Sequence, residues 1–137
     1  MAKTLTYGMV GGGPDAFIGD AHRRAIGLDG TAAIAAGVFS RNREKSLQMA
    51  ESLGISPDRC YEDYQTMARA EGEREDGIDF VTVVTPNQSH YEICRAFLEA
   101  GIHVACDKPV TTTYGQAKEL ETLAEEMGLL FMVTYTY

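Results

Sequence analysis

Short apolar runs alternate along the whole chain with stretches in which apolar residues recur every third or fourth position. Apolar runs of about four to eight residues are typical of buried strands, and the second pattern is typical of helices that bury one face. A regular alternation of the two predicts parallel strands that are joined by crossover helices. The sequence therefore predicts an α/β fold built on a doubly wound parallel sheet, the Rossmann-type arrangement.

The predicted strands lie at residues 4–10, 32–39, 78–84, 102–106 and 129–134. The predicted helices lie at residues 19–28, 43–53, 62–70, 89–100 and 114–127. The strand at residues 78–84 is almost continuously apolar, which is typical of a strand covered on both faces, so we expect it near the centre of the sheet. A short piece at residues 59–61 predicts an edge strand, and the charged run at residues 71–76 predicts an exposed loop.

A glycine cluster follows the first predicted strand, in the segment YGMVGGGPDAFIGDAH at residues 7–22. Glycine has no Cβ, so its backbone can turn sharply and approach a pyrophosphate closely. The helix that comes next directs N–H groups and the positive end of its dipole at the phosphates. The segment therefore predicts a dinucleotide-binding site, and we expect NADP or NAD as the cofactor.

Two registers of the glycine motif fit the sequence. Gly11, Gly13 and Ala16 match G-x-G-x-x-A literally. In the other register Gly19 is the third glycine, and residues 14–18 form a lengthened loop. We favour the second register, because the proline and aspartate after Gly13 do not suit an early helix start. Gly19 then permits the helix to pack closely against the strand.

The tip of the second strand reads Ser40, Arg41, Asn42, Arg43, about 20 residues beyond Gly19. An acidic residue here would bind the ribose of NAD, whereas arginine accommodates the 2′-phosphate of NADP. Arginine forms bidentate, charge-assisted hydrogen bonds with phosphate, so Ser40 and Arg41 favour NADP over NAD. The alternative is that Ser40 or Asn42 caps the next helix and that the arginines face solvent.

The segment TPNQSHYEIC begins at Thr85, where the central strand ends. The carboxyl ends of parallel strands face the ligand crevice, so Thr85, Asn87 and His90 are candidates to line a cofactor there. The alternative is that Asn87 caps the following helix and that His90 lies on the surface of this helix.

The next strand ends in Cys106, Asp107, Lys108 and Pro109. A lysine that faces a partly desolvated crevice can hydrogen-bond a substrate hydroxyl and help to move its proton, so Lys108 is the catalytic candidate. Pro109 fixes the turn behind it. The alternative is an Asp–Lys pair in an exposed turn. We expect Cys106 to be a small buried residue rather than a nucleophile, since no histidine or other base is evident beside it.

The composition excludes several classes of protein. The chain has 137 residues, about the size of one domain, with 45% hydrophobic and 23% charged residues. A net charge of -8 repels nucleic acid, and no basic stripe offsets it. The three cysteines form no CxxC pair, which fits a reducing cytoplasm and gives no metal site. No apolar run reaches the roughly 18 residues of a membrane span, so we expect a cytoplasmic protein without membrane contact.

Four motifs in order resemble the Gfo/Idh/MocA family, which includes glucose-fructose oxidoreductase and inositol dehydrogenase. The motifs are GMVGGGPDAFIGDAH, FSRNREKS, TPNQSHY and AGIHVACDKP, and together they extend over essentially the whole chain. Members are two-domain, NAD(P)-dependent oxidoreductases that act on sugars, cyclitols and related compounds, commonly as oligomers. The resemblance implies a Rossmann-type cofactor domain, a sugar-like small-molecule substrate and a homo-oligomer.

The resemblance also assigns the family's phosphate-binding glycines and its T-P-N-x-x-H segment to residues of this chain. These residues are Gly11, Gly13, Gly19, Thr85, Asn87 and His90. His22 falls on the histidine of the family's G-x-x-H pattern. Lys108 and Pro109 match its E-K-P motif, whose lysine touches both substrate and nicotinamide. Asp107 stands where the family has glutamate and is one methylene shorter, which reduces its reach towards the nicotinamide ribose.

The family's remaining catalytic groups, an aspartate and a histidine, lie in a C-terminal α/β domain that residues 1–137 do not include. We therefore expect the chain to be the N-terminal cofactor domain of a longer enzyme, incomplete for catalysis by itself. A rival interpretation is a non-catalytic nucleotide-binding module, which would not need Lys108. A methyltransferase that uses S-adenosylmethionine is disfavoured, because it would need an acidic residue at the tip of the second strand.

Overall fold

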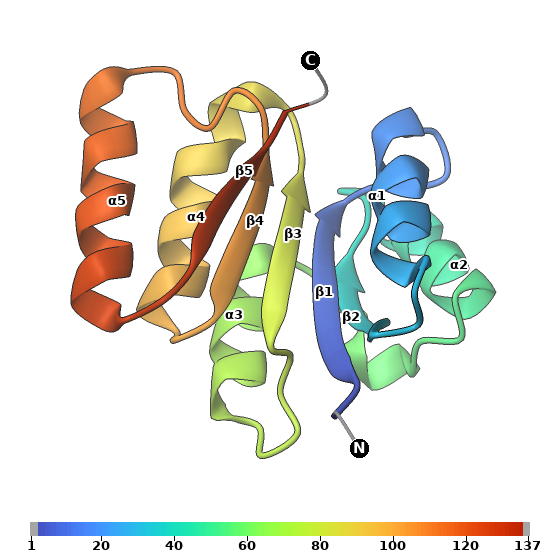
Figure 1. Ribbon diagram of the computed structural model, residues 1–137. Coiled ribbons are helices and arrows are strands. Elements are labelled where there is room, and N and C mark those ends of the chain that lie inside the picture. The colour runs from blue at the N-terminus through green and yellow to red at the C-terminus, as the bar shows by residue number, and fades with distance from the viewer. Residues whose placement is uncertain (1–2, 136–137) are drawn as a thin grey trace.

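Five parallel strands form the centre of the protein (Figure 1). The computed structural model describes residues 3–135. The strands are β1 (Leu5–Gly11), β2 (Ala32–Val38), β3 (Phe80–Val84), β4 (His103–Asp107) and β5 (Phe131–Thr134). They lie in the order β2-β1-β3-β4-β5, and every neighbouring pair is parallel. The predicted α/β fold is confirmed, and β3 lies in the middle of the sheet, as its apolar sequence predicts.

Helices cover both faces of the sheet (Figure 1). One face carries α1 (Phe17–Gly27) and α2 (Arg43–Ser52), and the other carries α3 (Tyr64–Glu73), α4 (His90–Glu99) and α5 (Tyr114–Met127). Two short 3₁₀ helices, η1 (Pro57–Arg59) and η2 (Asn87–Ser89), precede α3 and α4. Each face has its own buried apolar cluster, so the sheet is doubly wound, as predicted. None of the helices described for residues 3–135 is long and apolar enough to cross a membrane.

Capping side chains fix where several helices begin. The side chains of Asn42, Asp63 and Thr113 each accept a backbone N–H from the first turn of α2, α3 and α5, respectively. Gly128 follows α5 in the left-handed conformation and ends it. The predicted helix at residues 114–127 is therefore confirmed with the same bounds.

The predicted edge strand at residues 59–61 is reduced to a single bridge. Pro57 begins η1, and this turn takes up residues that a strand would need. Only Cys60 pairs with β2, through a parallel bridge to Gly37. Gly37 also pairs with β1, so the bridge lies on the outer edge of β2, where a doubly wound sheet would add its next strand.

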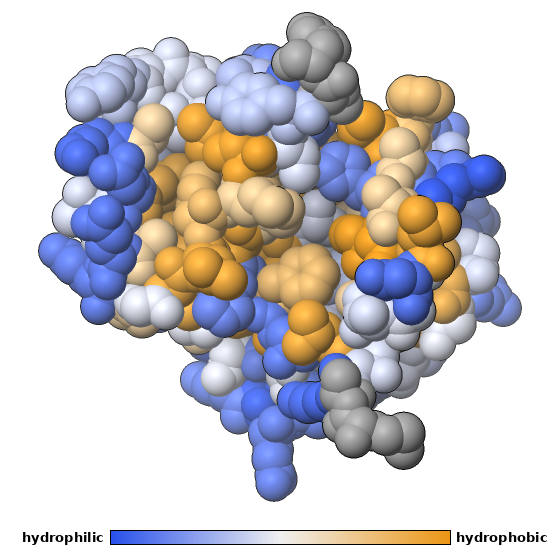
Figure 2. Space-filling model, viewed as in Figure 1, coloured by the Kyte–Doolittle hydropathy of each residue, from blue (hydrophilic) through white to orange (hydrophobic). Residues whose placement is uncertain are grey.

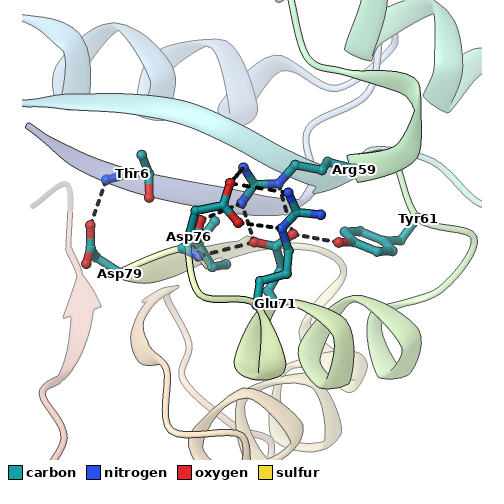
Figure 3. A network of polar contacts seen from close by, with 8 residues as sticks. Thr6, Arg59, Tyr61, Glu71, Asp76 and Asp79 are labelled. Carbon is teal, nitrogen blue, oxygen red and sulfur yellow. Dashed lines mark hydrogen bonds and ion pairs between the residues drawn. The ribbon is translucent and has the colours of Figure 1, made fainter.

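The charged run at residues 71–76 is only partly the exposed loop that its composition predicts, with residues 74–76 outside the helix. α3 extends into this run, and Glu71 is only 2% exposed. Its carboxylate accepts hydrogen bonds from Nε of Arg59 at 3.1 Å, the hydroxyl of Tyr61 at 2.6 Å and the backbone N–H of Ile78 at 3.1 Å (Figure 3). The prediction was wrong because the partners that allow this carboxylate to be buried lie outside the run.

The Glu71 carboxylate ties together α3, the stretch after η1 and the entry to β3. A buried carboxylate is tolerated when a cation and further donors satisfy its oxygens, and Arg59 supplies both charge and hydrogen bonds. Burial, together with the hydrogen bond to Glu71, raises the pKa of Tyr61 to about 12, so this hydroxyl stays a donor. The network therefore holds the amino end of β3 in place.

One face of β4 and β5 carries no helix among residues 3–135. Figure 2 shows a broad hydrophobic area on this face, between α5 and α1. Successive side chains of a strand point to opposite faces, so Phe131 packs against the helices while Met132 is 57% exposed. A contiguous apolar area of this kind is typical of a surface that contacts other protein.

Glu71→Ala is expected to lower the free energy of unfolding by about 3–5 kcal/mol, because it removes the buried counter-charge of Arg59, whose guanidinium then keeps only the exposed carboxylate of Asp76, 3.9 Å away. Urea unfolding followed by circular dichroism measures the change. Glu73→Ala, at an exposed position of the same helix, is the control and should stay within about 0.5 kcal/mol of the wild type. An effect of Glu71→Ala as small as that of the control would contradict the role of the network.

Candidate functional site

A crevice of about 680 Å³ opens at the carboxyl ends of β1, β2 and β3. β2 lies on one side of β1 and β3 lies on the other, so the strand order changes direction at this point. Ligands of open α/β sheets bind at such a switch point. The lining comes from the glycine loop after β1, the tip of β2, the start of α3 and the residues after β3. The volume lies within the range of about 300–1,000 Å³ that is usual for ligand pockets.

The loop after β1 needs glycine at several positions. Gly11 and Gly12 have φ angles of +94° and +75°, in the left-handed region that other residues rarely adopt. At Gly13 a Cβ would lie 2.7 Å from the carbonyl oxygen of Phe39, at the tip of β2. The loop therefore presents bare backbone to the crevice, which is what close approach to a pyrophosphate requires.

α1 contacts this loop through Gly19. A Cβ on this buried glycine would lie 2.4 Å from the Cα of Gly12, so the close packing expected in the second register is present. The loop is shorter than that register predicts, because α1 already begins at Phe17. The N-cap residue is Ala16, whose methyl group cannot cap the helix. The N–H groups of the first turn thus remain available to an anion.

Arg23 of α1 contacts the glycine loop and is a site residue that the motifs did not predict. Its Nη1 donates to the carbonyl oxygen of Gly12 at 2.9 Å and lies 3.2 Å from Sδ of Met9. Arg23 comes one helical turn after Gly19, and that spacing is the signal that could have revealed it. The guanidinium fixes a peptide of the glycine loop and brings positive charge next to it.

At the tip of β2 only part of the predicted set faces the crevice. Ser40 and Arg41 line it. Oγ of Ser40 accepts the backbone N–H of Asn42 at 3.1 Å, which leaves its own hydroxyl proton to donate. Asn42 caps α2, as the alternative interpretation had it. The guanidinium of Arg43 is used elsewhere, because it donates to the carbonyl oxygen of Cys60 at 2.7 Å.

The residues after β3 form a short 3₁₀ turn before α4. Thr85 and Pro86 line the crevice, and Oγ1 of Thr85 accepts the hydroxyl of Ser89 at 2.7 Å. Asn87 is exposed and is the first residue of η2, so it does not cap α4. The predicted capping is wrong because η2 separates Asn87 from the helix.

His90 lies in the interior rather than in the lining of the crevice. Its side chain is fully buried at the start of α4. Nδ1 lies 2.7 Å from the carbonyl oxygen of Pro109, and Nε2 lies 2.8 Å from the carbonyl oxygen of Thr85. The alternative that put His90 on the helix surface is therefore wrong.

Cys106 is buried, as predicted, but the expectation that no base lies beside it is wrong. A hydrogen bond from Cys94, aided by the nearby His90, lowers the pKa of Cys106 to about 6 against the effect of burial. The contact with Cys106, together with burial, raises the pKa of Cys94. Burial by itself would lower the pKa of His90, but hydrogen bonds with Cys106 and with two backbone carbonyl groups raise it to about 9.

Asp107 ends β4 and Lys108 follows it, at the same edge of the sheet as the glycine loop. The carboxylate of Asp107 accepts the hydroxyl of Thr134 at 3.3 Å, and its Oδ1 lies 3.9 Å from Nε2 of His22. Lys108 is half-buried and Pro109 is exposed, and the peptide bond between them is cis. Asp107 is therefore tied to β5 and α1.

The crevice has the features of a nucleotide site and not of a metal site. Among residues 3–135 no group of three or more His, Cys, Asp or Glu side chains is arranged to hold a metal ion. A second hollow, of about 520 Å³, lies between α4 and α5 and away from the strand ends. The bare glycine loop, the uncapped start of α1 and the serine and arginine at the tip of β2 define a dinucleotide-binding domain of the Rossmann type.

Comparison with known proteins gives the family. Residues 5–135 match the family model GFO_IDH_MocA, which is described as an oxidoreductase family with an NAD-binding Rossmann fold. The chain belongs to the Gfo/Idh/MocA family of NAD-binding oxidoreductases, which confirms the resemblance carried by the four motifs.

Three relatives show how much of a family member the chain represents. It is 43% identical to the uncharacterized oxidoreductase YfiI of Bacillus subtilis (strain 168) over 100% of this chain and 35% of that protein. An inositol dehydrogenase homolog from Azotobacter vinelandii, complexed with NADH and myo-inositol, shares 41% identity and a TM-score of 0.95 over 98% of this chain and 35% of that chain. A biliverdin reductase from Synechocystis sp. PCC 6803, in complex with biliverdin and NADP+, shares 26% identity and a TM-score of 0.77 over 96% of this chain and 38% of that chain. The chain thus spans about a third of the length of these relatives.

Gly19→Ala is expected to lower the free energy of unfolding by about 1–3 kcal/mol, because the added methyl group would push α1 away from the glycine loop. Thermal unfolding without cofactor measures the change. Gly27→Ala is the matched control in the same helix, since nothing lies within 4 Å of a Cβ there. It should leave stability unchanged or raise it by up to about 1 kcal/mol. Equal effects of the two substitutions would contradict the close contact.

Proposed function

We propose that this chain binds NADP or NAD in the crevice at the strand ends. As the cofactor domain of a longer oxidoreductase, it would serve hydride transfer to or from a sugar, a cyclitol or a related hydroxy or keto compound. The observation that carries the proposal is the bare backbone of Gly11 to Gly13 beside the uncapped start of α1. The Azotobacter vinelandii relative, complexed with NADH and myo-inositol, supports the substrate class.

The residues present fit a dinucleotide. Backbone N–H groups of the glycine loop and of the first turn of α1 would hold the pyrophosphate, and Thr85 would line the path of the cofactor. The whole chain has a net charge of -8, so an anionic ligand has to be held by local dipoles and local cations. The guanidinium of Arg23, 2.9 Å from the carbonyl oxygen of Gly12, is one such cation.

The tip of β2 favours NADP. The hydroxyl of Ser40 keeps a proton to donate, and Arg41 lines the same part of the crevice. A hydroxyl and a guanidinium suit the 2′-phosphate of NADP, whereas NAD is usually held there by a carboxylate. With Arg43 engaged by the carbonyl group of Cys60, Arg41 is the guanidinium that would meet the phosphate.

Lys108 is the residue that would act on the substrate. A bound nicotinamide ring supplies or accepts the hydride. The ammonium group of Lys108, half-buried at the end of β4, would donate a hydrogen bond to the substrate oxygen, stabilise negative charge that develops on it and hold or return its proton. The remaining catalytic groups would come from chain outside these residues, since the relatives are about three times as long.

Arg41→Ala is expected to weaken NADP binding by about 10–100-fold and to change NAD binding by less than about two-fold, because only NADP carries the 2′-phosphate. Calorimetric titration of this chain with each dinucleotide measures both affinities. Arg95→Ala removes the same charge from an exposed position on α4 and is the control. An equal loss for NADP and NAD, or no loss for either, would remove the assignment of Arg41.

Lys108→Ala in the longer enzyme is expected to lower turnover by about 10²–10⁴-fold, because the substrate oxygen loses its proton partner. Steady-state kinetics measure turnover, and calorimetry checks that NADP still binds. Lys118→Ala, at an exposed position on α5, is the control and should leave both unchanged. Wild-type turnover in Lys108→Ala would favour the rival interpretation, a nucleotide-binding module without this chemistry.

A further inference from the structure

His90 differs from an ordinary buried histidine in what its two ring nitrogens meet. Nδ1 lies 2.7 Å from the carbonyl oxygen of Pro109, and Nε2 lies 2.8 Å from the carbonyl oxygen of Thr85. A carbonyl oxygen accepts hydrogen bonds and has none to donate. Both nitrogens must therefore carry a hydrogen, and a histidine ring with two N–H groups is a cation.

A neutral ring does not fit this setting. It has one N–H group and one nitrogen lone pair, so the lone pair would face a carbonyl oxygen at hydrogen-bond distance. The side chain is 0% exposed, so solvent does not relieve that repulsion. Moving the single proton of a neutral ring from one nitrogen to the other leaves the same conflict, because each nitrogen faces a carbonyl oxygen.

We propose that His90 is a positioning residue, protonated at neutral pH, which clamps the backbone after β3 to the backbone after β4 and thereby fixes the position of Lys108 at the end of β4. Thr85, at one side of the clamp, lines the crevice. Pro109, at the other side, directly follows Lys108. The positioning of Lys108 rests on the proposed function, whereas the charge on His90 rests on geometry alone.

The titratable groups around the ring favour the charge. Cys106 of β4 contacts His90, while Cys94 of α4 and Asp107 act on Cys106. The hydrogen bond from Cys94, followed by the influence of His90, lowers the pKa of Cys106 against the effect of burial, so its sulfur favours a cation beside it. The two carbonyl dipoles at the ring nitrogens lower the cost of burying the cation.

This charge makes stability depend on pH. Burial lowers the pKa of His90, but its contacts raise it overall from 6.5 to about 9. The contribution of His90 to stability is therefore complete below about pH 6.5 and is lost as the pH rises to about 9. The pKa of Cys106 is lowered, so the contribution of this group has the opposite pH dependence and is lost as the pH falls through about 6.

Nuclear magnetic resonance of the 137-residue chain with nitrogen-15-labelled histidine measures the charge directly. At about pH 7.5 the ring of His90, identified by through-bond assignment in the wild type, is expected to show two protonated nitrogens. His103 is the internal control, because its Nδ1 accepts the backbone N–H of Leu130 at 3.0 Å and so carries a lone pair. A neutral His90 ring would overturn the proposal, and this measurement does not depend on the folding of any variant.

Kinetics of the longer enzyme test the positioning. His90→Gln is expected to lower turnover by about 10–100-fold, as loss of a supporting residue typically does. It should add no further loss in a Lys108→Ala background, because both changes then remove the same function. His103→Gln is the matched control and should leave turnover unchanged. Independent losses from His90→Gln and Lys108→Ala would overturn the positioning role.

The outcomes separate this inference from the proposed function. An imidazolium at His90 in a chain that binds neither NADP nor NAD would support the clamp and contradict the proposed function. A neutral ring in a chain that binds NADP would overturn the clamp and support the proposed function.

Discussion

The contact between the backbones of Gly12 and Gly19 constrains everything around the crevice. Because neither residue has a Cβ, α1 can begin directly beside the glycine loop and direct its first N–H groups at the crevice. The same placement lets Arg23 reach the carbonyl group of Gly12. It also brings His22, from the adjacent position of the helix, within 3.9 Å of Asp107 at the end of β4. One close helix contact thus shapes the proposed phosphate site and reaches the end of the strand that precedes Lys108.

A buried charged side chain lies at each end of the sheet. In both places it connects segments that the hydrogen bonds between strands do not connect. At the amino ends, Glu71 of α3 is held by the guanidinium of Arg59 and the entry to β3. At the carboxyl ends, His90 of α4 bridges the backbones that follow β3 and β4. Each charge is compensated by partners of opposite polarity. Burying the charge therefore lowers stability little while all partners are present, and much when one partner is removed. The helices of one face therefore do more than cover the sheet, since they also fix its two rims.

Strands and helices could be predicted because their apolar periodicity is local, and the glycine loop because a positive φ demands glycine. The errors fall where a polar side chain meets partners distant in the sequence. The sequence EGERED predicts that Glu71 is exposed to solvent. Its burial depends on the extension of α3 and on the position of Arg59, and neither can be predicted from the run itself. His90 and Arg43 contact backbone carbonyl groups, and every residue has such a group, so the sequence does not indicate these partners. The capping by Asn87 failed because one 3₁₀ turn shifted the start of α4. Only the folded arrangement of the strand ends supplies that information.

Asp107 stands at the end of β4 where the family has glutamate, and its shorter side chain makes different contacts there. The resemblance leads one to expect glutamate before the lysine, with a reach one methylene longer. In this chain the shorter carboxylate accepts the hydroxyl of Thr134 at 3.3 Å and lies 3.9 Å from Nε2 of His22, so it ties β4 to β5 and faces α1. A carboxylate held by the frame in this way is less able to extend into the crevice. Lys108, whose backbone is fixed on its far side through Pro109 and the ring of His90, would then be the charged residue of this segment that reaches a ligand.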